Sequence, residues 1–128
     1  MIIIDFGPST PGEPHAFTSG IYAFENSRFM RMNDSADVIW RYEVDFHERD
    51  SVFTALMEFS REANFSVEYE NYSYGVFVVS IAGVRNQGSG GLNWQYWVNS
   101  QYASVSMDNQ YLRDGDIIEI RYCGDPFA

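Results

Sequence analysis

The second half of the chain consists of short aromatic-rich segments separated by turn residues, and this pattern constrains the fold most. Flat and β-branched side chains pack well on a pleated surface, so such segments favour strands. The run Tyr74–Ile81 is almost continuously apolar, which predicts a central strand covered on both faces. Asn99-Ser100 is typical of a tight turn, and Asp114-Gly115 of a hairpin before the last strand. The strands of this half are predicted at 66–72, 74–81, 92–99, 102–106 and 116–122.

One amphipathic helix is predicted ahead of these strands. Asp50 or Ser51 can cap its N-terminus, because a short side-chain oxygen accepts a free amide hydrogen of the first turn. Apolar residues recur at helical spacing from Val52 to Ala63, and Asn64 suits a left-handed stop. Strands on both sides of a single helix predict an α+β fold, with the helix packed across a mixed or antiparallel sheet. The strands expected before the helix are 2–6, 21–24, 29–32 and 38–46.

The chain is strongly acidic, with a formal net charge of −10 over 128 residues, and all eight of its cations are Arg. Without a basic cluster it has no electrostatic means of holding phosphates, so nucleic acid is not an expected partner. An anionic membrane surface is disfavoured for the same reason. Solubility is the simplest interpretation of the acidity, and a cationic partner is the alternative.

Neither a membrane segment nor a targeting signal is predicted in this chain. No stretch approaches the roughly 20 apolar residues that a membrane-spanning helix needs, so membrane insertion is not expected. The apolar start Met1–Ile4 is followed at once by Asp5 and lacks a basic region, which argues against a secretory signal peptide. The single cysteine, Cys123, cannot form an internal disulfide and does not indicate a redox compartment.

Residues suited to catalysis or metal binding are sparse. His15 lies in a Pro-rich loop and His47 follows a strand; neither has a partner at metal-ligand spacing, and a surface position is the simpler interpretation. Glu58 and Glu62 lie one helical turn apart, where solvated carboxylates are commoner than acid–base pairs. Cys123 has no His near it in sequence. We therefore predict that the protein is not an enzyme, has no catalytic residue and binds no metal directly.

The aromatic block from residue 94 to 97 is the strongest candidate for a binding surface. Alternation along a strand places Trp94 and Tyr96 on one face and Trp97 on the other. If one face packs on the helix, the other presents a large ring beside polar groups, and such rings often mark binding sites. The alternative, in which all three rings are core, stays open. The Gly-rich loop Gln87–Gly91 lacks the Lys of a P-loop and is expected to be a mobile loop that can bind ligand through backbone amides.

Four segments carry a resemblance to one protein family; they are Ser51–Leu56, Tyr74–Val84, Tyr96-Trp97 and Asp114–Tyr122. They are similar, in this order, to the family's helix start, its aromatic-Gly strand ending in Ser-Ile-x-Gly, its Tyr-Trp strand and its final hairpin. On these motifs the segment from Val38 to Tyr122 resembles the transcobalamin-like C-terminal domain. That domain is the β-domain of transcobalamin, intrinsic factor and haptocorrin, and it has bacterial relatives.

The resemblance implies an α+β fold with a β-grasp-like (ubiquitin-like) mixed sheet crossed by one helix, and with extra N-terminal strands or an N-terminal arm. It divides the chain into an extension at 1–37, packed on the domain, and a transcobalamin-like β-domain at 38–128. It implies a non-catalytic binding module for cobalamin or a related corrinoid, without a protein–cobalt bond. A separate helical-barrel domain or another protein is the implied partner. The family's bacterial members are often secreted or at the cell surface, and the resemblance implies the same location here.

The sequence departs from the family pattern at two positions. Ser100 stands where bacterial relatives usually have Gly, and Tyr74 where the animal proteins tend to have Trp. Carried over position by position, the resemblance still implies a ligand site along two strands and the loop that joins them. A protein-interaction or surface-display module, using a sheet edge or the exposed aromatic face, is the alternative function. The implied ligand-binding residues are Tyr74, Gly75, Gln87, Gly88, Ser89, Gly90, Trp94, Tyr96, Trp97, Asn99 and Tyr102.

Overall fold

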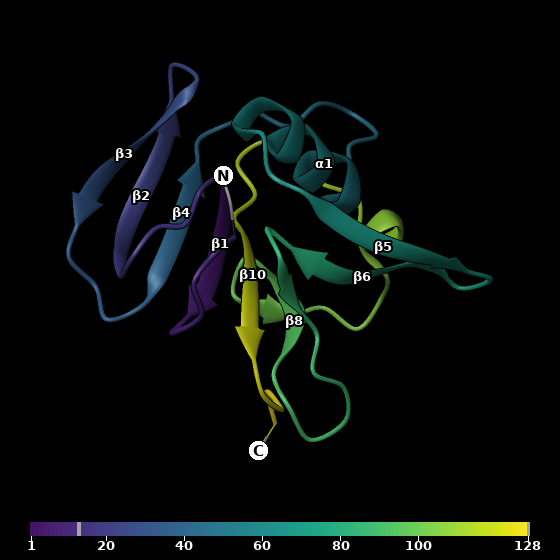
Figure 1. Ribbon diagram of the computed structural model, residues 1–128. Coiled ribbons are helices and arrows are strands. Elements are labelled where there is room, and N and C mark those ends of the chain that lie inside the picture. The colour runs from purple at the N-terminus through teal and green to yellow at the C-terminus, as the bar shows by residue number, and fades with distance from the viewer. Residues whose placement is uncertain (13, 128) are drawn as a thin grey trace.

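The computed structural model describes residues 1–12 and 14–127, and strands make up most of its regular structure (Figure 1). None of the described helices has the length and apolar character that a membrane span requires. In chain order the elements are β1 (Ile2–Gly7), β2 (Gly20–Glu25), β3 (Arg28–Asn33), β4 (Val38–Tyr42), α1 (Val52–Ala63), β5 (Val67–Tyr72), β6 (Gly75–Ile81), β7 (Val84–Arg85), β8 (Asn93–Val98), β9 (Gln101–Tyr102), the 3-10 turn η1 (Met107–Asn109) and β10 (Ile118–Cys123).

Two sheets form within the described residues. The large sheet has the order β3-β2-β4-β1-β10-β8-β9, and the small sheet has the order β5-β6-β7. The large sheet is mixed, because β1 runs parallel to β10 and β2 runs parallel to β4, whereas its other neighbours are antiparallel. One helix and mostly strands confirm the predicted α+β class with a mixed sheet.

The N-terminal strand β1 lies in the middle of the large sheet. It pairs with β4 on one side and with β10 on the other, with Ile2 opposite Ile118 and Ile4 opposite Ile120. In Figure 1 the purple β1 runs beside the yellow β10, so the two ends of the chain meet in the sheet centre. Residues 1–37 therefore contribute three strands of the large sheet, one of them central.

Helix α1 begins and ends as its sequence indicates. The Ser51 hydroxyl accepts the Thr54 amide hydrogen at 3.1 Å, and the Thr54 hydroxyl in turn accepts the Ser51 amide hydrogen at 2.8 Å. This reciprocal pair satisfies amides that a helix start otherwise leaves free. Asn64 ends the helix with a left-handed φ of 57°. The predicted apolar stripe is buried; it consists of Val52, Leu56, Phe59 and Ala63.

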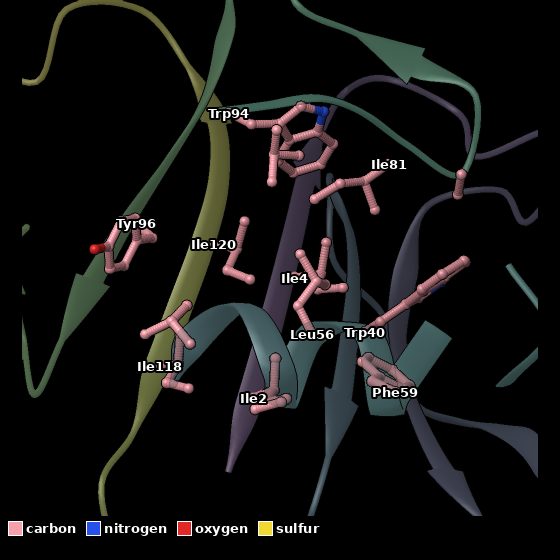
Figure 2. Packing of buried hydrophobic residues seen from close by; sticks show 14 of the residues in the cluster. Ile2, Ile4, Trp40, Leu56, Phe59, Ile81, Trp94, Tyr96, Ile118 and Ile120 are labelled. Carbon is pink, nitrogen blue, oxygen red and sulfur yellow. The ribbon is translucent and has the colours of Figure 1, made fainter. Parts of the chain in front are cut away.

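The main core lies between α1 and one face of the large sheet. Figure 2 shows the core cluster around Leu56 of α1, with Ile2 and Ile4 of β1 and Ile118 and Ile120 of β10. Trp40 of β4 is fully buried in the same cluster and packs edge-on against Phe6, with ring centroids 4.7 Å apart. The apolar area that these side chains remove from water is the main favourable term for this fold.

The prediction that Tyr74–Ile81 is covered on both faces is wrong. β6 is the middle strand of the small sheet, but burial alternates along it until its last two residues, Ser80 and Ile81, which are both buried. Val76 and Val78 are buried, whereas Phe77 is 45% exposed. The reason is that the small sheet packs one face on the core and leaves the other open to solvent.

The turn predictions have mixed outcomes. Asn99 and Ser100 form the predicted tight turn between β8 and β9, both with positive φ, at 49° and 67°. Asp114-Gly115 is a turn, but the hairpin prediction is wrong, because β10 pairs with β1 and β8. The strand expected at 102–106 shrinks to β9, and the strand expected at 38–46 ends at Tyr42.

Candidate functional site

A cavity of about 240 Å³ lies between β6 and β8, where the small and large sheets meet without pairing. The segment that leads from β9 to η1 forms its third wall. The cavity therefore has two strands and one irregular segment as its sides. It is lined by Tyr74, Val76, Phe77, Val78, Trp94, Gln95, Tyr96, Tyr102, Ala103, Ser104, Val105, Ser106 and Met107.

We call this cavity the inner cavity. A second, larger depression of about 850 Å³, the outer groove, adjoins it, and the two share several lining residues. The Gly-rich loop and the residues after β10 form its outer walls. We call the two together the aromatic groove, because rings occur along its whole length. The shared lining residues are Phe77, Trp94, Gln95 and Tyr102. The rings that line the groove are Tyr74, Phe77, Trp94, Tyr96, Tyr102 and Phe127.

Four of these rings are exposed to an unusual degree. The exposed fractions are 63% for Tyr74, 45% for Phe77, 37% for Tyr102 and 78% for Phe127. Tyr74 stacks on Tyr72 with ring centroids 5.3 Å apart, while Tyr102 meets Phe127 edge-on at 5.0 Å. Rings held in place by neighbouring rings can pack on a flat ligand with little loss of side-chain freedom.

Trp94 and Tyr96 form the floor of the groove and belong mainly to the core. Each is only 6% exposed, and each polar end is satisfied. The Trp94 ring N–H donates to the Val84 carbonyl at 2.7 Å, and the Tyr96 hydroxyl donates to the Val105 carbonyl at 2.7 Å. Burial raises the pKa of Tyr96 above its usual range, so the phenol stays protonated.

Gly75 lies beneath the 3-10 turn and is the point where β6 and that turn are fixed together. The Val76 amide donates to the Asp108 carboxylate at 2.9 Å, and the Ser106 hydroxyl donates to the Tyr74 carbonyl at 3.1 Å. The hydrogen bond from Val76 lowers the pKa of Asp108 below its ordinary value. Gly75 is therefore placed next to the groove as a close backbone contact and does not line it.

The Gly-rich loop is closed by its own hydrogen bonds. The amide of Gly88 donates to the Asn93 side-chain oxygen at 2.9 Å, and the Asn93 side-chain nitrogen donates back to the Gly88 carbonyl at 3.0 Å. The Gln87 side-chain oxygen accepts the Leu92 amide hydrogen at 2.8 Å. Gly88, Ser89 and Gly90 line the outer groove, while Gln87 supports the loop from within.

Two of the implied site residues lie outside the groove. Trp97 does not line the groove: its ring meets that of Tyr102 edge-on, with centroids 5.4 Å apart, and the Arg121 guanidinium lies 4.4 Å from its ring centroid. Asn99 fastens its turn to the residues before β10, because its side chain donates to Asp116 and accepts from the Ile117 amide, both at 2.9 Å. The structure gathers the remaining implied residues on or beside the groove.

The sequence interpretation missed several groove residues. Phe77 belongs to a run of apolar residues that favours the core, and the available signal is the two-residue period of a strand, which places Phe77 on the face opposite to Val76 and Val78. Phe127 and Val105 carry no local signal, because they lie in irregular segments and reach the groove only through the fold.

His15 is half-buried. Its ring stacks on Phe17 with centroids 5.9 Å apart, and its Nε2 lies 2.7 Å from the Ala63 carbonyl oxygen at the end of α1. Across residues 1–12 and 14–127, no group of three or more His, Cys, Asp or Glu side chains is arranged to hold a metal ion.

Comparison with known families identifies one family for the part of the chain that contains the cavity. Residues 50–123 match the family described as "Domain of unknown function (DUF4430)". The chain belongs to this family. The DUF4430 segment spans α1 to β10 and contains every residue that lines the cavity between β6 and β8, whereas the larger depression also includes residues 124–127 beyond it.

One solved structure shares the fold of this DUF4430 chain. It is a protein from Ruminococcus gnavus, described provisionally as a metal binding protein, with 14% sequence identity and a TM-score of 0.50. The similarity covers 82% of this chain and 94% of the other. At this identity the likeness concerns the fold alone. Among curated proteins no match is found.

Proposed function

We propose that this chain is a non-catalytic binding module that holds a corrinoid, or a similar large flat ligand, in the aromatic groove. The observation that carries the proposal is the row of exposed rings along one groove, from Tyr74 through Tyr102 to Phe127. Apolar rings in such a number are rarely left in water on a surface with no binding role. The relation of DUF4430 to the transcobalamin-like family supports the same ligand class.

The topology supports a β-grasp-like fold as part of this proposal. Four neighbouring strands, β4-β1-β10-β8, have a parallel pair at their centre and antiparallel partners outside. Helix α1 follows β4 and packs across this part of the sheet. A mixed sheet of this order crossed by one helix is what the resemblance to the transcobalamin-like domain implies.

The groove covers one side of a flat ligand and leaves the other side to solvent. We propose that a helical-barrel domain or another protein covers that second side. The ligand's own cobalt needs no protein ligand in this arrangement, and both His side chains lie outside the groove lining. The metal binding ascribed to the Ruminococcus gnavus protein is not extended to this chain, since only the fold is shared.

Titration with cyanocobalamin tests the proposal, followed by the visible spectrum and by calorimetric heat. Tyr102→Ala and Tyr74→Ala should each weaken binding by about 3–10-fold, the usual worth of one well-placed ring. Tyr111→Ala is the matched control, because Tyr111 is also an exposed tyrosine, at 65%, and lies outside the groove. Absence of binding at ~100 μM ligand, about −5.5 kcal/mol, would exclude a stand-alone corrinoid role.

A protein-interaction module is the second candidate, and the free edge of β5 favours it. Among residues 1–12 and 14–127, β5 pairs only with β6, and five of its six residues are exposed. Such an edge can add a strand from a partner. Asn71→Pro removes an amide on that edge without removing a bond to β6, because the Asn71–Val76 pair lies between the bonded pairs. If a partner strand adds to the β5 edge, Asn71→Pro should abolish binding of that partner and leave cyanocobalamin binding unchanged.

A further inference from the structure

The edge of β6 that faces the groove is only partly paired. The Val76 amide donates to Asp108, and the Val78 carbonyl accepts from the Asn86 side chain at 2.9 Å. Both N–H and C=O of one strand residue point to the same side, so the Val76 carbonyl and the Val78 amide also face the groove. β7 does not cover them, because it pairs only with Ser80 and Ile81.

The facing edge of β8 repeats this pattern. The Trp94 amide donates to the Asn86 side-chain oxygen at 2.7 Å, and the Tyr96 carbonyl accepts from the Ala103 amide at 3.1 Å. The Trp94 carbonyl and the Tyr96 amide are therefore directed into the same groove. Within residues 1–12 and 14–127, no backbone bond outside the regular ladders reaches any of these four groups.

The four groups define a short slot between residues 76–78 of β6 and residues 94–96 of β8. The Asn86 amide closes one end, since it bonds both strands there. Asp108 and Ala103 close the other end. The slot thus offers one amide hydrogen and one carbonyl oxygen on each side over a length of about one peptide unit. Because these amide hydrogens and carbonyl oxygens lack a partner across the slot, they favour a ligand group that supplies both a hydrogen-bond donor and an acceptor.

We infer that the slot is a subsite for a carboxamide group. A carboxamide has a carbonyl that can accept from the Val78 or Tyr96 amide and an N–H that can donate to the Val76 or Trp94 carbonyl. A carboxylate fits poorly, because it cannot donate and because the Asp108 carboxylate lies at the end of the slot. The inference rests on the proposed function, in which the ligand is a corrinoid whose rim carries amide side chains. It identifies a carboxamide as the group of that ligand that binds in the slot.

Nuclear magnetic resonance of the ¹⁵N-labelled protein tests the slot directly with small amides. N-methylacetamide should shift the amide signals of Val78 and Tyr96 in a saturable way, with smaller changes elsewhere. N,N-dimethylacetamide accepts but cannot donate, so it should bind up to about 10-fold more weakly, which is the usual net effect of one hydrogen bond. Acetate should leave both signals unchanged at the same concentration. Equal shifts with all three probes, or shifts scattered over the surface, would overturn the inference.

A pair of variants separates the slot from the rest of the groove. Ala103→Leu enlarges a side chain that lines the inner cavity and should abolish the N-methylacetamide shifts. Ala16→Leu is the control, because Ala16 is exposed and lies in the N-terminal loop. The cyanocobalamin titration is the independent arm. Corrinoid binding without amide shifts would refute the slot and keep the proposed function; amide shifts without corrinoid binding would refute the proposed function and keep the slot.

Discussion

Replacement of Gly75 by Ala tests how the groove is fixed to the fold. Gly75 has a φ of +130°, which side chains of L-residues rarely adopt. A Cβ added there would lie 2.1 Å from the Ser106 hydroxyl oxygen and 2.7 Å from an Asp108 carboxylate oxygen. Since both distances are far below van der Waals contact, the turn at η1 must move when Gly75 is replaced.

The expected loss of stability has two sources. A non-Gly residue in such a backbone conformation costs about 1–3 kcal/mol. Movement of the turn also weakens the bonds from Val76 to Asp108 and from Ser106 to Tyr74, each worth about 0.5–1.5 kcal/mol or somewhat more where a charge takes part. We therefore expect Gly75→Ala to lower the free energy of unfolding by about 3 kcal/mol or more.

Urea denaturation followed by tryptophan fluorescence measures this loss as a fall in the midpoint at constant slope. Two glycines provide matched controls. Gly115 has a φ of +90° with no atom within 4 Å of the added Cβ, so Gly115→Ala should cost about 1 kcal/mol. Gly124 also has open space and no such φ, so Gly124→Ala should change stability by about 0.5 kcal/mol or less. A loss at Gly75 no larger than that at Gly115 would refute the argument from close contact.

Three further outcomes follow from local geometry. Ser51→Ala removes the acceptor for the Thr54 amide and should destabilise the protein by about 1 kcal/mol in the same urea assay. Ser100→Gly relieves a left-handed φ of 67° and should raise the melting temperature, with a gain of about 1 kcal/mol; an unchanged value would contradict the strain. The lowered pKa of Asp108 stabilises the fold above the ordinary pKa of Asp and is lost as pH falls through the lowered value. Asp108→Asn should therefore reduce the dependence of unfolding on pH in that acidic range, and the variant should lose more stability relative to the unchanged protein at pH 7 than at acidic pH.

Helix α1 shows what the sequence could predict. Its cap at Ser51, its apolar stripe and its stop at Asn64 are all set by residues within one short segment, and all three are confirmed. The turn at Asn99-Ser100 is confirmed for the same reason, since two adjacent residues determine it. Local signals of this kind need no knowledge of the rest of the chain.

The position of β1 shows what the sequence could not predict. The pattern of residues 2–6 indicates a strand, but it does not say which strands lie beside it. The neighbours of β1 are β4 and β10, and the partner of Ile2 in β10 is Ile118, at the far end of the chain. Such pairing depends on global topology, which a single sequence without an alignment does not record.

The candidate site combines both cases. Its rings at 74, 94, 96 and 102 were identifiable as unusual aromatic residues, but the groove exists only because β6 and β8 belong to different sheets. Periodicity along β6 predicts which side chains alternate, yet it does not say that Phe77 faces solvent. That outcome follows from the small sheet having only one covered face.

The contact between Gly75 and Ser106 can be isolated because the two residues are distant in sequence and meet only in the native fold. Ser106→Gly removes both the hydroxyl and the Cβ that an alanine at 75 would meet, the latter at 2.7 Å. If steric contact is the main cost, the double variant should be more stable than the sum of the two single changes predicts, by about 1 kcal/mol or more in a double-mutant cycle. The cost of the unusual φ would remain in both backgrounds and cancel in the cycle. Additive losses would instead mean that backbone strain at residue 75, and not the turn above it, makes glycine necessary there.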